Sequence, residues 1–234
     1  MLSASKLAGY LSHNLMRPDC SSASLKEGCS LVASRNLKSL CVRPCDVADA
    51  ERQLKGSGRP VVAAVAFPHG ATDTSIKVAE TQKLIDDGAK EIIAVTNMGK
   101  LVSERFEYAE QDLKAVTLTA FRRGIPVYVA FDSCFLNERF FKIACKIADN
   151  IGAQGIITAT GYGSTGTTSA EIARIRELLG GRVKCIANGG IRTLAQVEEL
   201  VEAGADWVIT PHSVQILEQA AQRTVAFSAL DAND

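Results

Sequence analysis

The chain has 234 residues, 47% of them hydrophobic, so it can bury a full core without a disulfide or a metal to hold it together. Its 26 basic and 26 acidic side chains balance, which argues against a nucleic-acid partner bound through a broad basic face. No apolar run is long enough for a membrane-spanning helix, and the amino terminus lacks the apolar stretch of a secretory signal. The seven cysteines, an odd and scattered number, form no disulfide framework, so we expect a cytoplasmic protein.

Short apolar runs rich in Val, Ile and Ala recur along the chain, and a helix-like segment follows most of them. Strands that are apolar on both faces suit a parallel sheet covered by helices. The predicted strands cover 11–15, 40–42, 61–67, 91–95, 127–131, 155–159, 183–187 and 207–210. Helices that end at a glycine are predicted over 76–87, 172–179 and 194–202.

Eight strand–helix units fit a small barrel. They average about 29 residues each in this chain, and about 250 residues are typical of a whole (β/α)8 TIM barrel. An open, doubly wound sheet is the competing topology. No linker or shift in composition divides the chain, so the sequence predicts one α/β domain over 1–234.

Barrel geometry indicates where a ligand would bind. Ligands of this fold contact the loops at the carboxyl ends of the strands. The polar residues at these ends are therefore the first candidates: Ser12, Asn14, Arg43, His69, Asn97, Asp132, Thr160, Asn188 and His212.

Four motifs resemble the 2-deoxyribose-5-phosphate aldolase family, in order along nearly the whole chain. They are AFPHGAT at 66–72, NMGKL at 97–101, TATGYG at 158–163 and NGGIRT at 188–193. The resemblance implies a TIM barrel in which a lysine forms a Schiff base with a carbonyl substrate. Such a lysine must lose its proton, which burial beside a second cation favours.

The chain departs from this family at the positions that carry the chemistry. The Schiff-base lysine aligns with Ile157, the second lysine with Ile186 and the proton-transferring aspartate with Ile93. A further family lysine aligns with Tyr128, and an aspartate aligns with Ser12. Isoleucine cannot form an imine or move a proton, so we predict that the chain does not use the Schiff-base mechanism.

The family's phosphate site is partly retained. A glycine-rich turn at a helix start binds anions through its main-chain N–H groups. The candidate anion-binding residues are Gly161, Gly189, Gly190 and Ser213. Pro211 removes one N–H donor, and His212 replaces a serine, so phosphate binding is predicted to be weakened.

Other residues could carry acid–base chemistry without a lysine. Tyr128 and Asp132 share strand parity, and His212 follows the last strand, so these three are the predicted catalytic residues. Asp132 has an alternative role as a turn cap, and Arg43 either binds an anion or pairs with a loop acid. The predicted substrate-binding residues are Ser12, Asn14, Arg43, Asn97, Thr160 and Asn188.

Three hypotheses remain open at this point. The first is a repurposed lyase, condensing or isomerising enzyme acting on a small carbonyl or anionic substrate by non-covalent acid–base chemistry. The second is a non-catalytic pseudoenzyme that binds or scaffolds, and the third is an aldolase that uses Lys184 instead. An apolar pocket floor below a polar rim would suit a ligand with an apolar part and an anionic or carbonyl end. We expect a small-molecule ligand, no cofactor and no metal, and the resemblance allows a homodimer.

Overall fold

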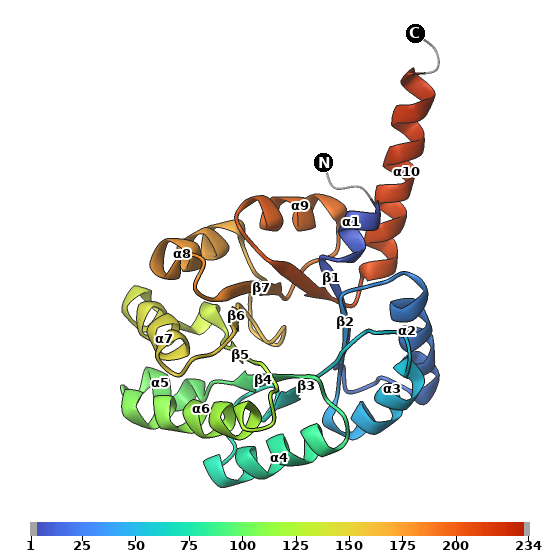
Figure 1. Ribbon diagram of the computed structural model, residues 1–234. Coiled ribbons are helices and arrows are strands. Elements are labelled where there is room, and N and C mark those ends of the chain that lie inside the picture. Colours follow the sequence, from blue (N-terminus) through green and yellow to red (C-terminus); the bar gives the residue numbers. More distant parts are fainter. Residues whose placement is uncertain (1–3, 232–234) are drawn as a thin grey trace.

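Eight parallel strands close into a barrel in chain order, and helices surround it (Figure 1). The computed structural model describes residues 4–231, so the first and last three residues of the predicted domain lie outside it. The prediction of a single (β/α)8 barrel is confirmed, and the open sheet is excluded. The strands are β1 (Leu11–Leu15), β2 (Ser39–Val42), β3 (Val61–Val65), β4 (Glu91–Val95), β5 (Val127–Ala130), β6 (Gly155–Ile157), β7 (Lys184–Asn188) and β8 (Trp207–Thr210).

Helices connect each strand to the next, and a short helix precedes the first strand. The helices are α1 (Ala4–Ala8), α2 (Ser22–Ser34), α3 (Val47–Leu54), α4 (Thr74–Asp86), α5 (Met98–Val102), α6 (Phe106–Phe121), α7 (Glu138–Asn150), α8 (Ser169–Leu179), α9 (Leu194–Glu202) and α10 (Ser213–Asp231). Side-chain caps fix several of their starts. Thr168 and Thr193 each form a reciprocal capping box, with Glu171 and Gln196 respectively, at the loops that lead into α8 and α9.

The core has two parts. The larger part lies between the strands and the helices, and the smaller part fills the barrel interior. The smaller part contains Ile93, Ile157 and Ile186, which are 3%, 2% and 0% exposed, together with Tyr128 and Trp207. The three isoleucines therefore point into the barrel, as their strand parity predicts, and they make its interior apolar.

A buried ion pair joins α4 to α6 behind the barrel wall. The Lys77 Nζ lies 2.5 Å from the Asp112 Oδ2 and donates to the Val95 carbonyl at 3.0 Å. Both side chains are almost fully buried, at 1% and 0% exposure. The Lys77 ammonium is thus fully engaged at the end of β4, outside the barrel interior.

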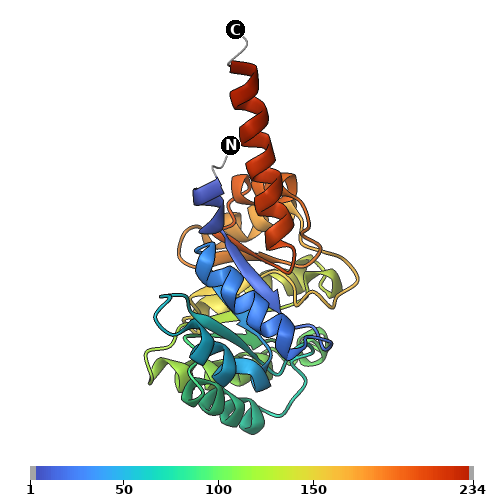
Figure 2. The ribbon, with the colours of Figure 1, turned by 90° about the vertical axis from the view of Figure 1, so that its right-hand side faces the viewer.

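Helix α10 runs back along the barrel beside α1 and continues past it, away from the other helices (Figure 2). In residues 4–231 no helix combines the length and the apolar character needed to cross a membrane.

Candidate active site

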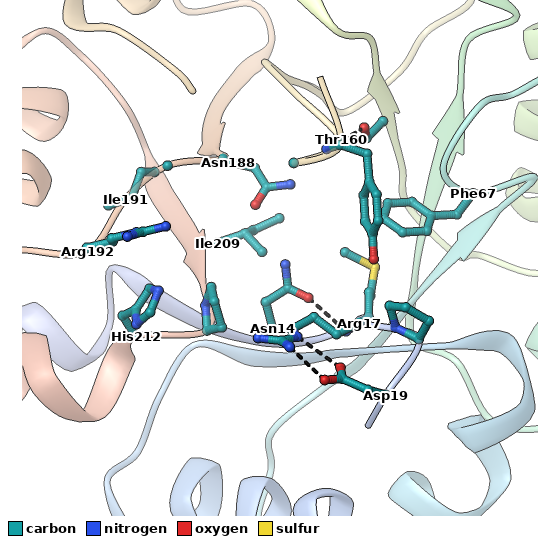
Figure 3. A pocket seen from close by; sticks show the side chains of 17 residues that line it. Asn14, Arg17, Asp19, Phe67, Thr160, Asn188, Ile191, Arg192, Ile209 and His212 are labelled. Atoms are coloured by element: carbon teal, nitrogen blue, oxygen red, sulfur yellow. Dashed lines mark hydrogen bonds and ion pairs between the residues drawn. The ribbon is translucent and has the colours of Figure 1, made fainter. Parts of the chain in front are cut away.

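A pocket of about 550 Å³ opens at the carboxyl ends of β1, β6, β7 and β8 (Figure 3). Its apolar floor is formed by Ile209 and Met16, and Phe67 and Tyr162 form part of its wall. The polar and glycine residues that line it are Asn14, Arg17, Asp19, Thr160, Gly161, Asn188, Gly189, Gly190, Arg192 and His212. This is the end of the barrel at which ligands of this fold bind.

Two glycine loops pack closely against each other on one side of the pocket. A side chain at Gly166 would lie 2.7 Å from the Gly189 carbonyl oxygen, and Gly189 and Gly190 both have positive φ. The Asn188 Nδ2 donates to the Ala159 carbonyl at 2.8 Å, which joins β7 to the end of β6. Among the described residues, none accepts a hydrogen bond from the main-chain N–H of Gly161, Gly189 or Gly190. These three N–H groups are therefore available to an anion.

Two guanidinium groups line the pocket, one paired with a carboxylate and one unpaired among the described residues. Arg17 donates to both carboxylate oxygens of Asp19, at 2.9 and 2.6 Å, and these hydrogen bonds raise the pKa of Arg17 and lower the pKa of Asp19. The Arg192 side chain extends into the pocket from the opposite side (Figure 3). Within residues 4–231 its guanidinium has no hydrogen-bond or ion-pair partner. An unpaired guanidinium at a pocket wall is suited to a carboxylate or phosphate.

His212 is the predicted proton carrier that lines the pocket. It is half-buried at the rim, and its Nδ1 lies 3.1 Å from the Gln215 Oε1. Four of the predicted residues at strand ends thus surround one cavity: Asn14, Thr160, Asn188 and His212.

The other two predicted catalytic residues do not line this cavity. Asp132 is buried and accepts hydrogen bonds from the N–H and the Oγ1 of Thr160, at 2.7 and 2.8 Å. It therefore holds the loop after β6, in keeping with the alternative of a structural role. Tyr128 packs edge-on against Trp207 deep in the barrel, and burial raises the pKa of its hydroxyl. The prediction that Tyr128 and Asp132 act on a ligand does not agree with these positions, because neither side chain faces the pocket.

Ser12 also lies below the pocket. It accepts a hydrogen bond from the Ser39 hydroxyl at 2.7 Å, and with Tyr128 it lines an interior cavity of only about 10 Å³. Ile209 lines both this small cavity and the pocket, so its side chain separates the two. A ligand in the pocket contacts Ile209 rather than the three isoleucines below.

Arg43, Asn97 and Ser213 have structural partners instead of facing the pocket. Arg43 pairs with Asp46 at 2.7 Å and donates to two main-chain carbonyls of the loop after β1, which is the second of its two predicted roles. Asn97 caps α5 by accepting from the Lys100 N–H at 3.1 Å. Ser213 is buried and lies 2.7 Å from the His13 Nδ1.

Lys184 lies at the amino end of β7, at the opposite side of the barrel from the pocket. Its side chain is 58% exposed, and its Nζ contacts Asp206 at 3.1 Å. A relocated Schiff-base lysine at this position would not reach a ligand in the pocket.

Four lining residues with polar or charged side chains are not predicted from the sequence: Arg17, Asp19, Tyr162 and Arg192. Arg192 and Tyr162 stand inside two of the motifs quoted above, so the motifs did carry a signal for them. Arg17 and Asp19 lie beyond the end of β1, where the Asn14 Oδ1 accepts from the Met16 N–H at 2.9 Å and bends the chain over the pocket.

The fold and the pocket define a (β/α)8-barrel protein with an open pocket at the carboxyl ends of its strands. A model of the DeoC/LacD family aldolases matches residues 12–131. The deoxyribose-phosphate aldolase of Treponema denticola is 32% identical over 212 residues, which cover 91% of this chain and 98% of the relative. The chain belongs to the DeoC/LacD aldolase family.

Solved structures agree with this assignment. The protein QR15, described as an aldolase, superposes with a TM-score of 0.88 and 29% identity, over 94% of this chain and 98% of its own. The tetrameric deoxyribose phosphate aldolase of Aeropyrum pernix superposes with a TM-score of 0.86 over 92% of this chain and 91% of its own. At 21% identity, this second likeness concerns the fold alone.

Proposed function

We propose that this barrel binds a small anionic carbonyl compound and acts on it by acid–base chemistry without a Schiff base. The observation that carries the proposal is the open pocket in which Arg192, free glycine N–H groups and His212 lie above a closed apolar interior. Retro-aldol cleavage, condensation and isomerisation all require a proton transfer next to a carbonyl group. All three reactions also develop negative charge on the carbonyl oxygen.

The absence of an imine follows from where the described lysines lie. None of them lines the pocket. Lys77 is buried in an ion pair behind the barrel wall, and Lys184 is exposed at the far end of β7. The sequence resemblance implies that the family's two catalytic lysines correspond to Ile157 and Ile186, which are buried in the barrel interior and have no nucleophilic atom.

In the proposed reaction His212 is the proton carrier. Its Nδ1 is held by Gln215, which leaves Nε2 to exchange a proton with the substrate. Arg192 and the N–H groups of Gly189 and Gly190 hold the anionic group or the developing oxyanion. Tyr128 and Asp132 have no direct part, because the first is buried below Ile209 and the second is bonded to Thr160.

A thermal-shift screen with phosphorylated sugars, 2-oxo acids and aromatic aldehydes, followed by turnover assays on the hits, tests this function. Arg192→Gln should weaken binding of any hit by about tenfold or more, because a charge-assisted hydrogen bond is lost. His212→Gln should keep the thermal shift but lower turnover by roughly 10² to 10⁴, the usual contribution of a general acid or base. His69→Gln is the matched control, because His69 is exposed and does not line the pocket.

The second candidate function is a non-catalytic binding or scaffolding module. The tightly filled interior favours it, because the cavity beneath Ile209 holds only about 10 Å³. A ligand that raises the melting temperature but is never converted, with no change in rate for His212→Gln, would select this candidate over the enzyme.

A further inference from the structure

A second cavity of about 290 Å³ lies beside the pocket and is almost entirely apolar. We call it the annex; the residues that line it are Met16, Pro18, Val42, Arg43, Pro44, Ala64, Phe67, Pro68 and Tyr162. Its one charged residue, Arg43, is already paired with Asp46 and with the carbonyls of Pro18 and Cys20. Arg43 therefore contributes its aliphatic stem to the wall, and the annex offers a ligand no free charge.

The annex and the pocket adjoin each other and share part of their lining. Met16, Pro18, Phe67 and Tyr162 line both of them. The rings of Phe67 and Tyr162 meet edge-on, with centroids 5.4 Å apart and planes at 86°, so two aromatic side chains form the boundary. A ligand held by Arg192 at one side of the pocket would have to extend past these rings to reach the annex.

The annex is the place for an apolar substituent, because the barrel floor is closed. The sequence predicts that Ile93, Ile157 and Ile186 form an apolar floor of the pocket, below its polar rim. They lie instead beneath Ile209, in an interior without room for a ligand group. A ligand can therefore bury apolar surface in the annex beside the pocket, but not in the barrel interior below it.

We propose that the annex is a specificity subsite that accepts an aryl or alkyl group carried by the anionic ligand. This inference rests on the proposed function, since the anion site supplies the anchor. The ligand class is then an anion with a hydrophobic substituent, such as an aryl-bearing 2-oxo acid or phosphate, rather than a fully hydroxylated sugar phosphate. The Met16, Phe67 and Tyr162 side chains would contact that substituent and select for it.

Two matched ligand pairs test the annex by isothermal titration calorimetry: phenylpyruvate with pyruvate, and phenyl phosphate with inorganic phosphate. The aryl member of at least one pair should bind about tenfold or more tightly than its partner, as expected for an apolar group that enters a preformed apolar site. The two pairs also distinguish a carboxylate from a phosphate as the anionic group.

Variants of residues that line the annex test whether the preference for an aryl group arises there. Pro44→Asp places a carboxylate in the annex without altering the pocket, and Ala64→Leu fills the annex with a larger side chain. Each should abolish the aryl preference while the Kd of the small anion stays within about twofold. Cys45→Asp is the control for Pro44→Asp, because Cys45 is the exposed neighbour and does not line the annex. Circular dichroism establishes that each variant is folded.

The outcomes separate the two proposals. Binding of the small anions without any aryl preference, or a preference that survives both annex variants, overturns the annex and leaves the anion site intact. If none of the four compounds binds to the wild-type protein, the anion site itself fails, and the annex fails with it. A preference that is lost in Pro44→Asp and Ala64→Leu but kept in Cys45→Asp supports the subsite.

Discussion

Arg17, Arg192 and His212 reach the pocket from the segments that follow β1, β7 and β8, whereas the interior positions of β4, β6 and β7 hold isoleucine. Loop residues are exposed and can bind and exchange protons with a ligand, while the buried strand positions contribute packing. Two buried polar contacts outside the pocket, Lys77 with Asp112 and His13 with Ser213, have measurable consequences for stability.

Replacing only one member of the Lys77–Asp112 pair should strongly destabilise the fold. Lys77→Met leaves the Asp112 carboxylate buried without its cation, and we expect the free energy of unfolding to fall by about 3 to 5 kcal/mol. The double variant Lys77→Met with Asp112→Leu should recover much of that loss, because no uncompensated charge remains. Urea denaturation of the single and double variants measures both. Equal losses in the single and double variants would contradict this reading.

His13 should make stability depend on pH. Burial lowers its pKa to about 4, from an ordinary value of 6.5, so the unfolded chain binds a proton between these values that the folded chain does not. The stability that the neutral ring contributes is therefore present above pH 6.5 and is lost as the pH falls towards 4. Between pH 7 and pH 5 this group alone should cost about 2 kcal/mol.

Comparison of the wild-type protein with His13→Gln isolates that effect, since the other titrating groups are common to both. The wild type should lose more stability than the variant between pH 7 and pH 5 in urea denaturation. Parallel pH profiles would mean that the pKa of the His13 ring is the same in the folded and the unfolded chain.

At the scale of elements, the turn after β3 is the clearest case of a glycine held in a closely packed position. Gly70 has φ of +65°, and a methyl group there would lie 2.2 Å from the Thr96 carbonyl oxygen. Gly56 also has positive φ, at +83°, but no atom lies within 4 Å of the added carbon. Gly56→Ala should therefore cost only about 1 to 2 kcal/mol of backbone strain.

Gly70→Ala should cost clearly more, because β3 and β4 must move apart to admit the methyl group. Both variants carry the strain of alanine at a positive φ. The difference between their midpoints of urea denaturation therefore measures the packing cost alone. Similar midpoints for the two variants would mean that the AFPHGAT turn relaxes at little expense.

The ends of the strands show what local sequence predicts and what it misses. The predicted limits of β1, β4 and β8 are the observed ones, and polar or turn residues bound the runs of β4 and β8. The run predicted to continue to residue 67 ends at Val65, since Ala66 adopts a positive φ and its N–H donates to Glu80 on α4. That contact joins segments 14 residues apart, so no local pattern indicates it.

The pocket shows the same division between residues that the local sequence predicts and residues that it misses. Asn14, Thr160, Asn188 and His212 lie within three residues of the strand ends, and barrel geometry brings them together. Arg17 and Tyr162 lie in loops whose paths are set by individual hydrogen bonds, such as that from the Met16 N–H to Asn14. Strand parity predicted that Tyr128 faces inward, but only the structure reveals how deep it lies beneath Ile209.

At the scale of the whole molecule, a family barrel is combined with an interior in which Ile93, Ile157 and Ile186 are buried. The chain forms a closed eight-stranded barrel, and the model of the DeoC/LacD aldolase family matches its residues 12–131. Apolar side chains fill most of the centre of the barrel, with the Ser12–Ser39 hydrogen bond among them, and the polar groups of the pocket lie at its mouth. The strands therefore supply packing in the interior, and β1 and β7 also supply Asn14 and Asn188 to the pocket.

Borohydride trapping tests the central claim most directly. The wild-type protein is incubated with 2-deoxyribose 5-phosphate, or with acetaldehyde, and treated with sodium borohydride, and adducts are located by mass spectrometry of peptides. The Treponema denticola aldolase serves as the positive control. We predict an adduct on a barrel lysine of that relative and none above the level of exposed lysines in this protein. A stoichiometric adduct on a single lysine here, accompanied by cleavage of the sugar phosphate, would contradict the account.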